Sequence, residues 1–224
     1  MAQRSNRFLT AFAGVAAALM VAATGAMAAV VIGNGSSNVL TGTPQRDVML
    51  GRAGDDTINA LERADVVRAG PGADTVNAGR GRDFVRGGRG ADVISGDGGH
   101  DFMSGGRGDD TLRGGARGDV IFANRGRDRE DGGDGRDRLW ALSRFDVEFI
   151  GDPNGDELSG GNGRDRFRVR DGELDLVHCG EGIDRVKADQ FDRVDNDCEH
   201  VDRGDVTSLD QVDDGDENRV EPGN

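Results

Sequence analysis

The sequence predicts an all-β protein built as a parallel β-solenoid of about nine 18-residue coils, with flexible termini. A nine-residue period runs from Gly33 to Phe149, where the chain divides into thirteen nonapeptides without a gap, and twelve of the thirteen sixth places hold aspartate. The composition agrees, because 38 glycines and 4 % aromatic residues suit an array with one thin apolar file per strand better than a globule with a thick core.

The repeat is clearest from Gly87 to Arg113, which reads GGRGADVIS, GDGGHDFMS, GGRGDDTLR. Glycines occupy the first, second or fourth places, aspartate the sixth, and an aliphatic residue or methionine the eighth. Glycine at this density favours turns in the first six places, and the last three suit a very short strand. Two nonapeptides therefore close one flattened coil, residues i and i+18 stack, and the eighth-place side chains fill the core.

The N-terminus, residues 1–29, predicts a secretory signal peptide. Arg4 and Arg7 form a basic start, residues 8–21 are mostly apolar, and Ala26-Met27-Ala28 resembles a cleavage site. No other segment approaches transmembrane length, so we expect a secreted, extracellular protein with no stable membrane span after cleavage.

The expected β-roll covers residues 30–168, and its first repeats, up to residue 68, are irregular. Asn38 replaces an aspartate, and Thr43-Pro44-Gln45 replaces glycines. Terminal repeats are commonly atypical because they close the end of the array, so we interpret these repeats as a cap that binds metal poorly. One inserted residue at Ile150, a second at Val169 and a later deletion restore the phase as far as Asp192.

Residues 169–201 are degenerate repeats, which we expect to form a disulfide-stapled C-terminal cap. The sequence separation of Cys179 and Cys198 exceeds the stacking distance by a single residue, and an exported chain favours their oxidation. The alternative is a zinc site in which His178 and His200 join the two cysteines. The adjacent residues His178 and Cys179 should point to opposite sides of a strand, which favours the disulfide. Residues 202–224 predict a disordered acidic tail.

Charge limits the classes of partner and activity. The net charge of −14 argues against binding to nucleic acid. Glu130 and Glu148 occupy eighth places exactly one coil length apart in the sequence, so they would stack in the same inner file. They could act as an acid/base pair for sugar hydrolysis. The preferred interpretation is a locally distorted roll with both glutamates facing solvent, because a buried unpaired carboxylate is costly.

The repeat chemistry indicates calcium. This ion takes six to eight oxygen ligands at about 2.3–2.6 Å and tolerates irregular geometry, whereas magnesium demands a smaller octahedral site. Glycine-rich turns expose backbone carbonyls, and the sixth-place aspartate adds a carboxylate. Because one turn cannot complete the shell, we expect a stacked pair such as Asp92 with Asp110, or Asp83 with Asp101, to hold an ion between turns.

These repeats resemble the RTX (repeats-in-toxin, haemolysin-type) calcium-binding family over most of residues 33–192. The resemblance implies a right-handed parallel β-roll with several Ca²⁺ ions between turns along both edges. Arg63, Arg117 and Arg144 depart from the pattern at fourth-place glycines, which puts their turns in doubt. The predicted calcium ligands are the sixth-place residues Asp56, Asp74, Asp83, Asp92, Asp101, Asp110, Asp119, Asp128, Asp137, Asp156 and Asp165.

Three functions fit this sequence. We favour a calcium-binding structural or surface-interaction module without enzymatic activity, in which Ca²⁺ drives folding after export. An adhesin-like or glycan-binding solenoid with a cell-surface or polysaccharide partner is the second, although the outward places are a mixture of Arg, Ser, Thr and Asn. A polysaccharide-active β-solenoid enzyme is the third, with Glu130 and Glu148 as its only candidate residues.

Overall fold

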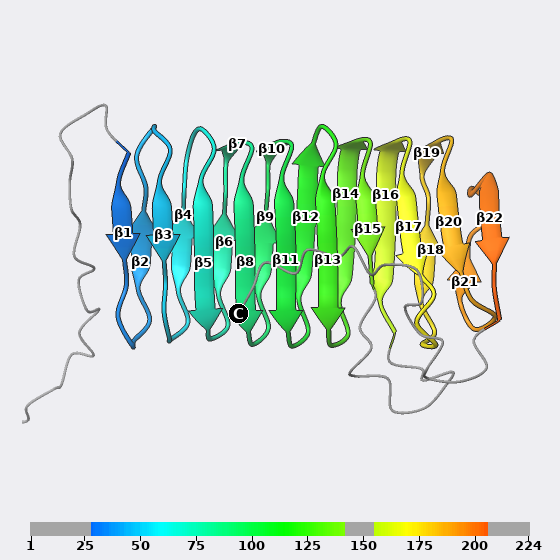
Figure 1. The fold of residues 1–224 in the computed structure, drawn as a ribbon, viewed down its shortest axis with the longest axis horizontal. Helices are drawn as coiled ribbons and strands as arrows, with labels where there is room; N and C mark the ends of the chain where they lie inside the picture. The colour runs from blue at the N-terminus through cyan, green and yellow to red at the C-terminus, as the bar shows by residue number, and fades with distance from the viewer. Residues whose placement is uncertain (1–27, 142–154, 206–224) are drawn as a thin grey trace, which may run out of the picture.

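The computed structural model describes residues 28–141 and 155–205, and these residues form a β-solenoid. Two parallel β-sheets face each other, and successive strands along the chain alternate between them in about nine turns (Figure 1). Neither described range contains a helix, and hence none that could span a membrane. The predicted fold class is confirmed.

Sheet A holds ten strands in sequence order. They are β1 (Val30–Ile32), β3 (Val48–Leu50), β5 (Val66–Pro71), β8 (Phe84–Arg89), β11 (Phe102–Arg107), β13 (Val120–Arg125), β15 (Arg138–Trp140), β17 (Arg166–Val169), β20 (Arg185–Ala188) and β22 (His200–Arg203). The last strand includes Asp202 and Arg203, the first two residues of the expected tail.

Sheet B has nine strands along its main path and three short strands beside it. The main path is β2 (Val39–Thr41), β4 (Thr57–Asn59), β6 (Thr75–Asn77), β9 (Val93–Ser95), β12 (Thr111–Ala116), β14 (Arg129–Gly135), β16 (Glu157–Gly163), β18 (Leu176–His178) and β21 (Arg193–Val194). The short strands are β7 (Arg80–Gly81), β10 (Gly98–Gly99) and β19 (Glu181–Gly182).

The register from β1 to β15 follows the predicted 18-residue coil. Met49 pairs with Val67, and Val67 pairs with Val85. The eighth-place side chains are buried, as the alternation of a strand requires. They form one core cluster that ends at Ile121 and a second that begins at Leu139. Each cluster is a narrow file, so little apolar area is buried per residue, and other interactions must contribute to stability.

The stacking after β14 differs from the prediction. Glu130 pairs with Leu158, and the separation between paired residues is 28 instead of 18. The chain therefore leaves out one nonapeptide and the inserted residue before it resumes stacking at β16. The prediction that Glu130 and Glu148 stack on each other is wrong, because Leu158 occupies that position. Glu148 itself lies outside the described residues.

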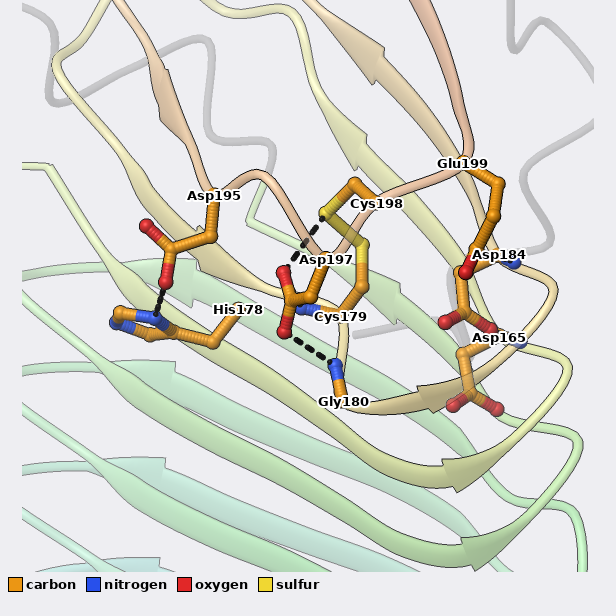
Figure 2. The surroundings of a disulfide bond; sticks show 9 residues. All are labelled: Asp165, His178, Cys179, Gly180, Asp184, Asp195, Asp197, Cys198 and Glu199. Atoms are coloured by element: carbon orange, nitrogen blue, oxygen red, sulfur yellow. Dashed lines mark hydrogen bonds and ion pairs between the residues drawn. A yellow bond between two sulfur atoms is a disulfide. The ribbon is translucent and has the colours of Figure 1, made fainter.

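The C-terminal coils contain the expected disulfide. Their register changes to 19 at β16–β18 and to 17 at β18–β21, as the predicted insertion and deletion require. Cys179 and Cys198 are joined, with 5.2 Å between their Cα atoms (Figure 2). The zinc alternative is wrong because both sulfurs are bonded to each other. His178 instead interacts with Asp195, with 2.6 Å between Nδ1 and Oδ2.

Removing the disulfide should destabilise the end of the solenoid. The bond spans 19 residues, and closing a loop of this length contributes about 3 kcal/mol to the free energy of unfolding. We expect a Cys179→Ala/Cys198→Ala variant to expose the amides of β18–β22 first, as measured by hydrogen exchange. Uniform loss of protection from β1 onward would contradict a role confined to the C-terminal cap.

Several second-place glycines have a positive φ, which glycine adopts freely and residues with a Cβ adopt only under strain. Gly88 has φ of 135°, and a Cβ added there would lie 2.2 Å from the Gly70 carbonyl oxygen. We expect Gly88→Ala to lower the free energy of unfolding in calcium by about 1–3 kcal/mol, measured by denaturant titration. Gly98→Ala is the matched control, because a Cβ there meets nothing within 4 Å. Equal effects of both substitutions would contradict this explanation.

Candidate metal-binding turns

The sixth-place residues stack in two rows, which we call files. In each file the residues directly precede the strands of one sheet. The file that precedes sheet A consists of Asp47, Asp65, Asp83, Asp101, Asp119, Asp137, Asp165 and Asp184. The file that precedes sheet B consists of Asn38, Asp56, Asp74, Asp92, Asp110, Asp128, Asp156, Asp175 and Asp192. All of these side chains are buried.

One oxygen of each stacked carboxylate is fixed by the backbone of the preceding coil. The Asp92 amide donates to Asp110 Oδ1 at 2.8 Å, and the Asp83 amide donates to Asp101 Oδ1 at 2.8 Å. The same bond recurs along both files and continues across the change in register, where the Asp137 amide donates to Asp165 Oδ1. The stacked pairs that the sequence predicted therefore lie at the same edge of the solenoid.

The second carboxylate oxygen is buried without a hydrogen-bond partner among the described residues. Such an atom is costly unless another group satisfies it. This holds for Oδ2 of Asp56, Asp65, Asp74, Asp83, Asp92, Asp101, Asp110, Asp119, Asp137, Asp165, Asp175 and Asp184.

The glycines of the turn make room for this oxygen. A Cβ added to first-place Gly105 would lie 2.3 Å from Asp110 Oδ2, and one added to Gly87 would lie 2.3 Å from Asp92 Oδ2. The fourth-place glycines similarly allow close stacking of the turns, since a Cβ on Gly90 would lie 2.1 Å from the Gly72 carbonyl oxygen. The glycine places therefore leave carboxylate and carbonyl oxygens uncovered by side chains.

Burial raises the pKa of these aspartates. Burial is the largest cause of the shift at every position. The hydrogen bond from a backbone amide lowers the pKa again in part, and neighbouring carboxylates raise it further at most of the positions. The pKa rises to about 6 for Asp74, Asp83 and Asp137, to about 7 for Asp65, Asp92, Asp101 and Asp165, and to about 8 for Asp110 and Asp119. Each carboxylate file therefore binds protons more strongly than free aspartate does, and should favour any other cation that can enter.

These turns fit calcium. The oxygen atoms offered by these turns are hard donors of carboxylates and carbonyls, repeated in stacked, irregular turns, and no soft ligand lies among the two files. The orphaned Oδ2 atoms need a cation or a proton, and the glycines beside them carry no side chain that would collide with them. A bound cation would remove the repulsion between stacked carboxylates and satisfy their second oxygens.

Two N-terminal positions differ because local groups already satisfy them. Thr43 donates its amide and hydroxyl to Asp47 Oδ2, and the Asn34 amide donates to Asn38 Oδ1 at 2.7 Å. Their oxygens are therefore engaged within their own turns. This arrangement agrees with a cap only at these two positions, because Asp56 and Asp65, which also lie in the irregular first repeats, keep an orphaned Oδ2.

The predicted ligands lie in the two files, and some residues with the same geometry were missed. Asp65, Asp175 and Asp184 also have an orphaned Oδ2, and their sixth-place position was the signal.

Arg63 and Arg117 keep the turn path without glycine, with φ of 73° and 80°. The aspartates of these two turns, Asp65 and Asp119, keep the same arrangement, so these substitutions strain the backbone but preserve the site.

Glu130 is enclosed in the core, which contradicts the expectation that it faces solvent. It is 1 % exposed and lies between Leu112 and Leu158 in the eighth-place file, at the division between the two core clusters. Burial raises the pKa of Glu130 well above its usual value; the charge of Asp128 adds to this and the Ala123 backbone offsets part of it. A carboxyl group this enclosed has no access to a substrate.

Replacing Glu130 by leucine should stabilise the solenoid. Leucine would join the two clusters, whereas neither glutamate oxygen has a hydrogen bond with standard geometry. We expect Glu130→Leu to raise the free energy of unfolding by about 1–3 kcal/mol at neutral pH. The folded pKa of Glu130 is raised, so the part of the cost that comes from ionisation is absent below about pH 4 and grows as pH rises. Glu181→Leu, at an exposed position, is the control; a destabilised Glu130→Leu would contradict this account.

Sequence reasoning also missed an aromatic row on the outer face of sheet A. Phe84 and Phe102 are stacked with 5.0 Å between ring centroids, Phe102 and Phe122 are 5.1 Å apart, and Phe122 and Trp140 are 4.4 Å apart. The outward residues looked mixed because consecutive nonapeptides face opposite sides. Comparing only every second nonapeptide would have revealed the row.

A parallel β-solenoid with stacked glycine and aspartate turns defines a class of calcium-binding repeat protein. Within the chain, residues 32–139 match the RTX calcium-binding nonapeptide repeat in overlapping copies at residues 32–67, 51–85, 68–103, 78–112 and 104–139. These residues belong to that repeat family. This part of the chain is thus built of calcium-binding repeats of the RTX type. No curated protein matches it significantly.

Proposed function

We propose that this chain is a secreted, non-enzymatic module that several Ca²⁺ ions fold into a rigid solenoid for a structural or surface-interaction role. The observation that carries the proposal is the row of buried, orphaned Oδ2 atoms along both edges. Stacked aspartates such as Asp92 with Asp110, and Asp101 with Asp119, would hold the ions together with carbonyl oxygens of the turns. Bound calcium would supply charge neutralisation between coils.

Calcium would act as a folding switch. Without it, stacked carboxylates repel one another and a thin core must offset the ordering entropy of a glycine-rich chain. With it, binding free energy becomes folding free energy. Extracellular calcium sites commonly have dissociation constants of about 10⁻⁴–10⁻³ M, so a chain exported unfolded would fold where calcium is plentiful.

Two features support secretion and a non-enzymatic role. Residues 1–29 have the composition of a signal peptide, and RTX repeat proteins are typically secreted. The enclosure of Glu130 removes one member of the acid pair that a polysaccharide-active enzyme would need.

Hydrogen exchange with and without calcium tests the folding switch, and cell fractionation tests the location. We expect amides of β3–β18 to be protected only in millimolar calcium, and the protein to accumulate outside the cell unless residues 1–29 are deleted. Protection that is equal in chelator would overturn the switch. Retention of the full chain inside the cell would overturn secretion while leaving calcium binding intact.

A further inference from the structure

Five arginines surround a hollow at the C-terminal part of sheet A. Arg136, Arg138, Arg164, Arg166 and Arg185 line a space of about 470 Å³ together with Asp137, Asp165 and Ile183. The arginines come from fifth and seventh places, on either side of the sixth-place aspartate, in three successive coils. The sequence signature is GRDRLW, GRDRFR and GIDRVK.

Three of these arginines are in direct register. Arg138 pairs with Arg166, and Arg166 pairs with Arg185, on the outward face of adjacent strands β15, β17 and β20. Neighbouring strands lie about 4.8 Å apart, and like charges directly opposite each other destabilise a sheet. This row therefore has an electrostatic cost that nothing in the fold requires.

Among the residues that the structure describes, the five arginines have no carboxylate ion-pair partner, although the chain is strongly acidic. Within residues 28–141 and 155–205, arginines elsewhere do form ion pairs, for example Arg129 with Glu157 and Arg170 with Asp202. None of the five does so with a described residue. Asp137 and Asp165 also line the hollow, but both side chains are buried. No described residue therefore occupies these guanidinium groups, and they can bind an external anion.

The surroundings indicate a charged polymer and not a lipid surface or a stacked ring. Trp140 lies on the same strand as Arg138, but Phe122 stacks on it and Arg168 lies 6.0 Å from its ring, so both faces are covered. Ile183, 50 % exposed, is the single apolar side chain of the hollow, whereas a membrane-binding face buries a broad apolar area. Arginine forks match carboxylates bidentately, and a row with one arginine per coil suits an anion that repeats along the solenoid axis.

We propose that these five arginines form a binding site for an acidic polysaccharide with carboxylates on successive sugars. The polymer would lie along the solenoid axis, with its carboxylates on Arg138, Arg166 and Arg185 and with Arg136 and Arg164 at its side. The proposal rests on the surface-interaction role proposed above and names its partner.

Binding of short oligogalacturonates, too short to gel with calcium, tests this site. We expect the full chain in millimolar calcium to bind them, to bind neutral galacto-oligosaccharides of equal length much more weakly, and to lose affinity as salt is raised. An Arg138→Gln/Arg166→Gln variant should bind at least about tenfold more weakly, because two charge-assisted contacts are lost. Far-ultraviolet circular dichroism on the same samples reports whether the solenoid is folded.

Arg89 and Arg107 provide the matched control. They also pair in register, on β8 and β11, and are exposed, but lie outside the hollow. Arg89→Gln/Arg107→Gln should leave the affinity within about twofold of the unmodified chain. Equal loss in both variants, absence of binding by a folded solenoid, or tighter binding to anionic phospholipid vesicles would each overturn the site. Absence of the fold in calcium would instead overturn the proposed function.

Discussion

In a chelator, lowering the pH from about 8 to about 5 is expected to fold the solenoid without any metal. The stacked aspartates have a folded pKa of about 6 to 8, above the ordinary value of 3.8. A raised carboxyl pKa contributes stability that is fully present below pH 4 and is lost as pH rises through the folded value. Protons should therefore substitute for calcium. Circular dichroism in chelator would show β-structure increasing as the pH falls.

The acid-folded state must be distinguished from aggregation, because the pI of the chain is about 4.6. Analytical ultracentrifugation at each pH provides the control, and it should show a monomer with a sedimentation coefficient close to that of the calcium-loaded chain. In saturating calcium the pH dependence between 8 and 5 should be much smaller. Stability in chelator that rises with pH would contradict the buried position of the two aspartate files.

A single Asp110→Asn substitution is expected to have opposite effects with and without calcium. The asparagine oxygen can still accept the Asp92 amide, which now donates to Asp110 Oδ1. In chelator at pH 8 the substitution removes a buried charge next to Asp92 and Asp128, so thermal stability should rise. In calcium it removes a charged ligand, and the affinity of the local site should fall by at least about tenfold.

Asp109→Asn is the matched control for the opposite effects expected of Asp110→Asn with and without calcium. Asp109 is the exposed neighbour of Asp110, and its Oδ1 accepts the Arg127 amide at 3.1 Å. The control changes the net charge equally but should alter neither stability in chelator nor calcium affinity appreciably. Asp110→Asn would argue against a metal role if it stabilised the chain equally in both conditions.

The period of nine predicted the coil, the core file and both aspartate files, since each follows from one repeating unit. The same period predicted the disulfide, because the spacing of Cys179 and Cys198 places them on adjacent coils. The period predicted the wrong stacking partner for Glu130. Counting residues in nines cannot tell whether a given nonapeptide forms part of a coil or is left out of the stacking. That choice decides whether Leu158 or Glu148 lies beside Glu130, and it depends on packing across the gap.

The arginine hollow and the aromatic row could not be predicted for a related reason. Both depend on which outward residues share a sheet, and this requires the true register on each side of the gap. The longer sequence separation between β15 and β17 makes Arg138 and Arg166 neighbours, whereas an unbroken phase places them on opposite sheets. The direction in which the guanidinium groups point is likewise a property of side-chain packing.

A calcium titration by isothermal calorimetry, with circular dichroism on the same samples, tests the central claim most directly. We predict that several ions bind cooperatively and that β-structure appears over the same concentration range, because each ion would join two coils of an otherwise unstable solenoid. A solenoid that is fully folded in chelator at pH 8 and binds no calcium would contradict the account. The aspartates would then serve only to fix the turns through their Oδ1 hydrogen bonds.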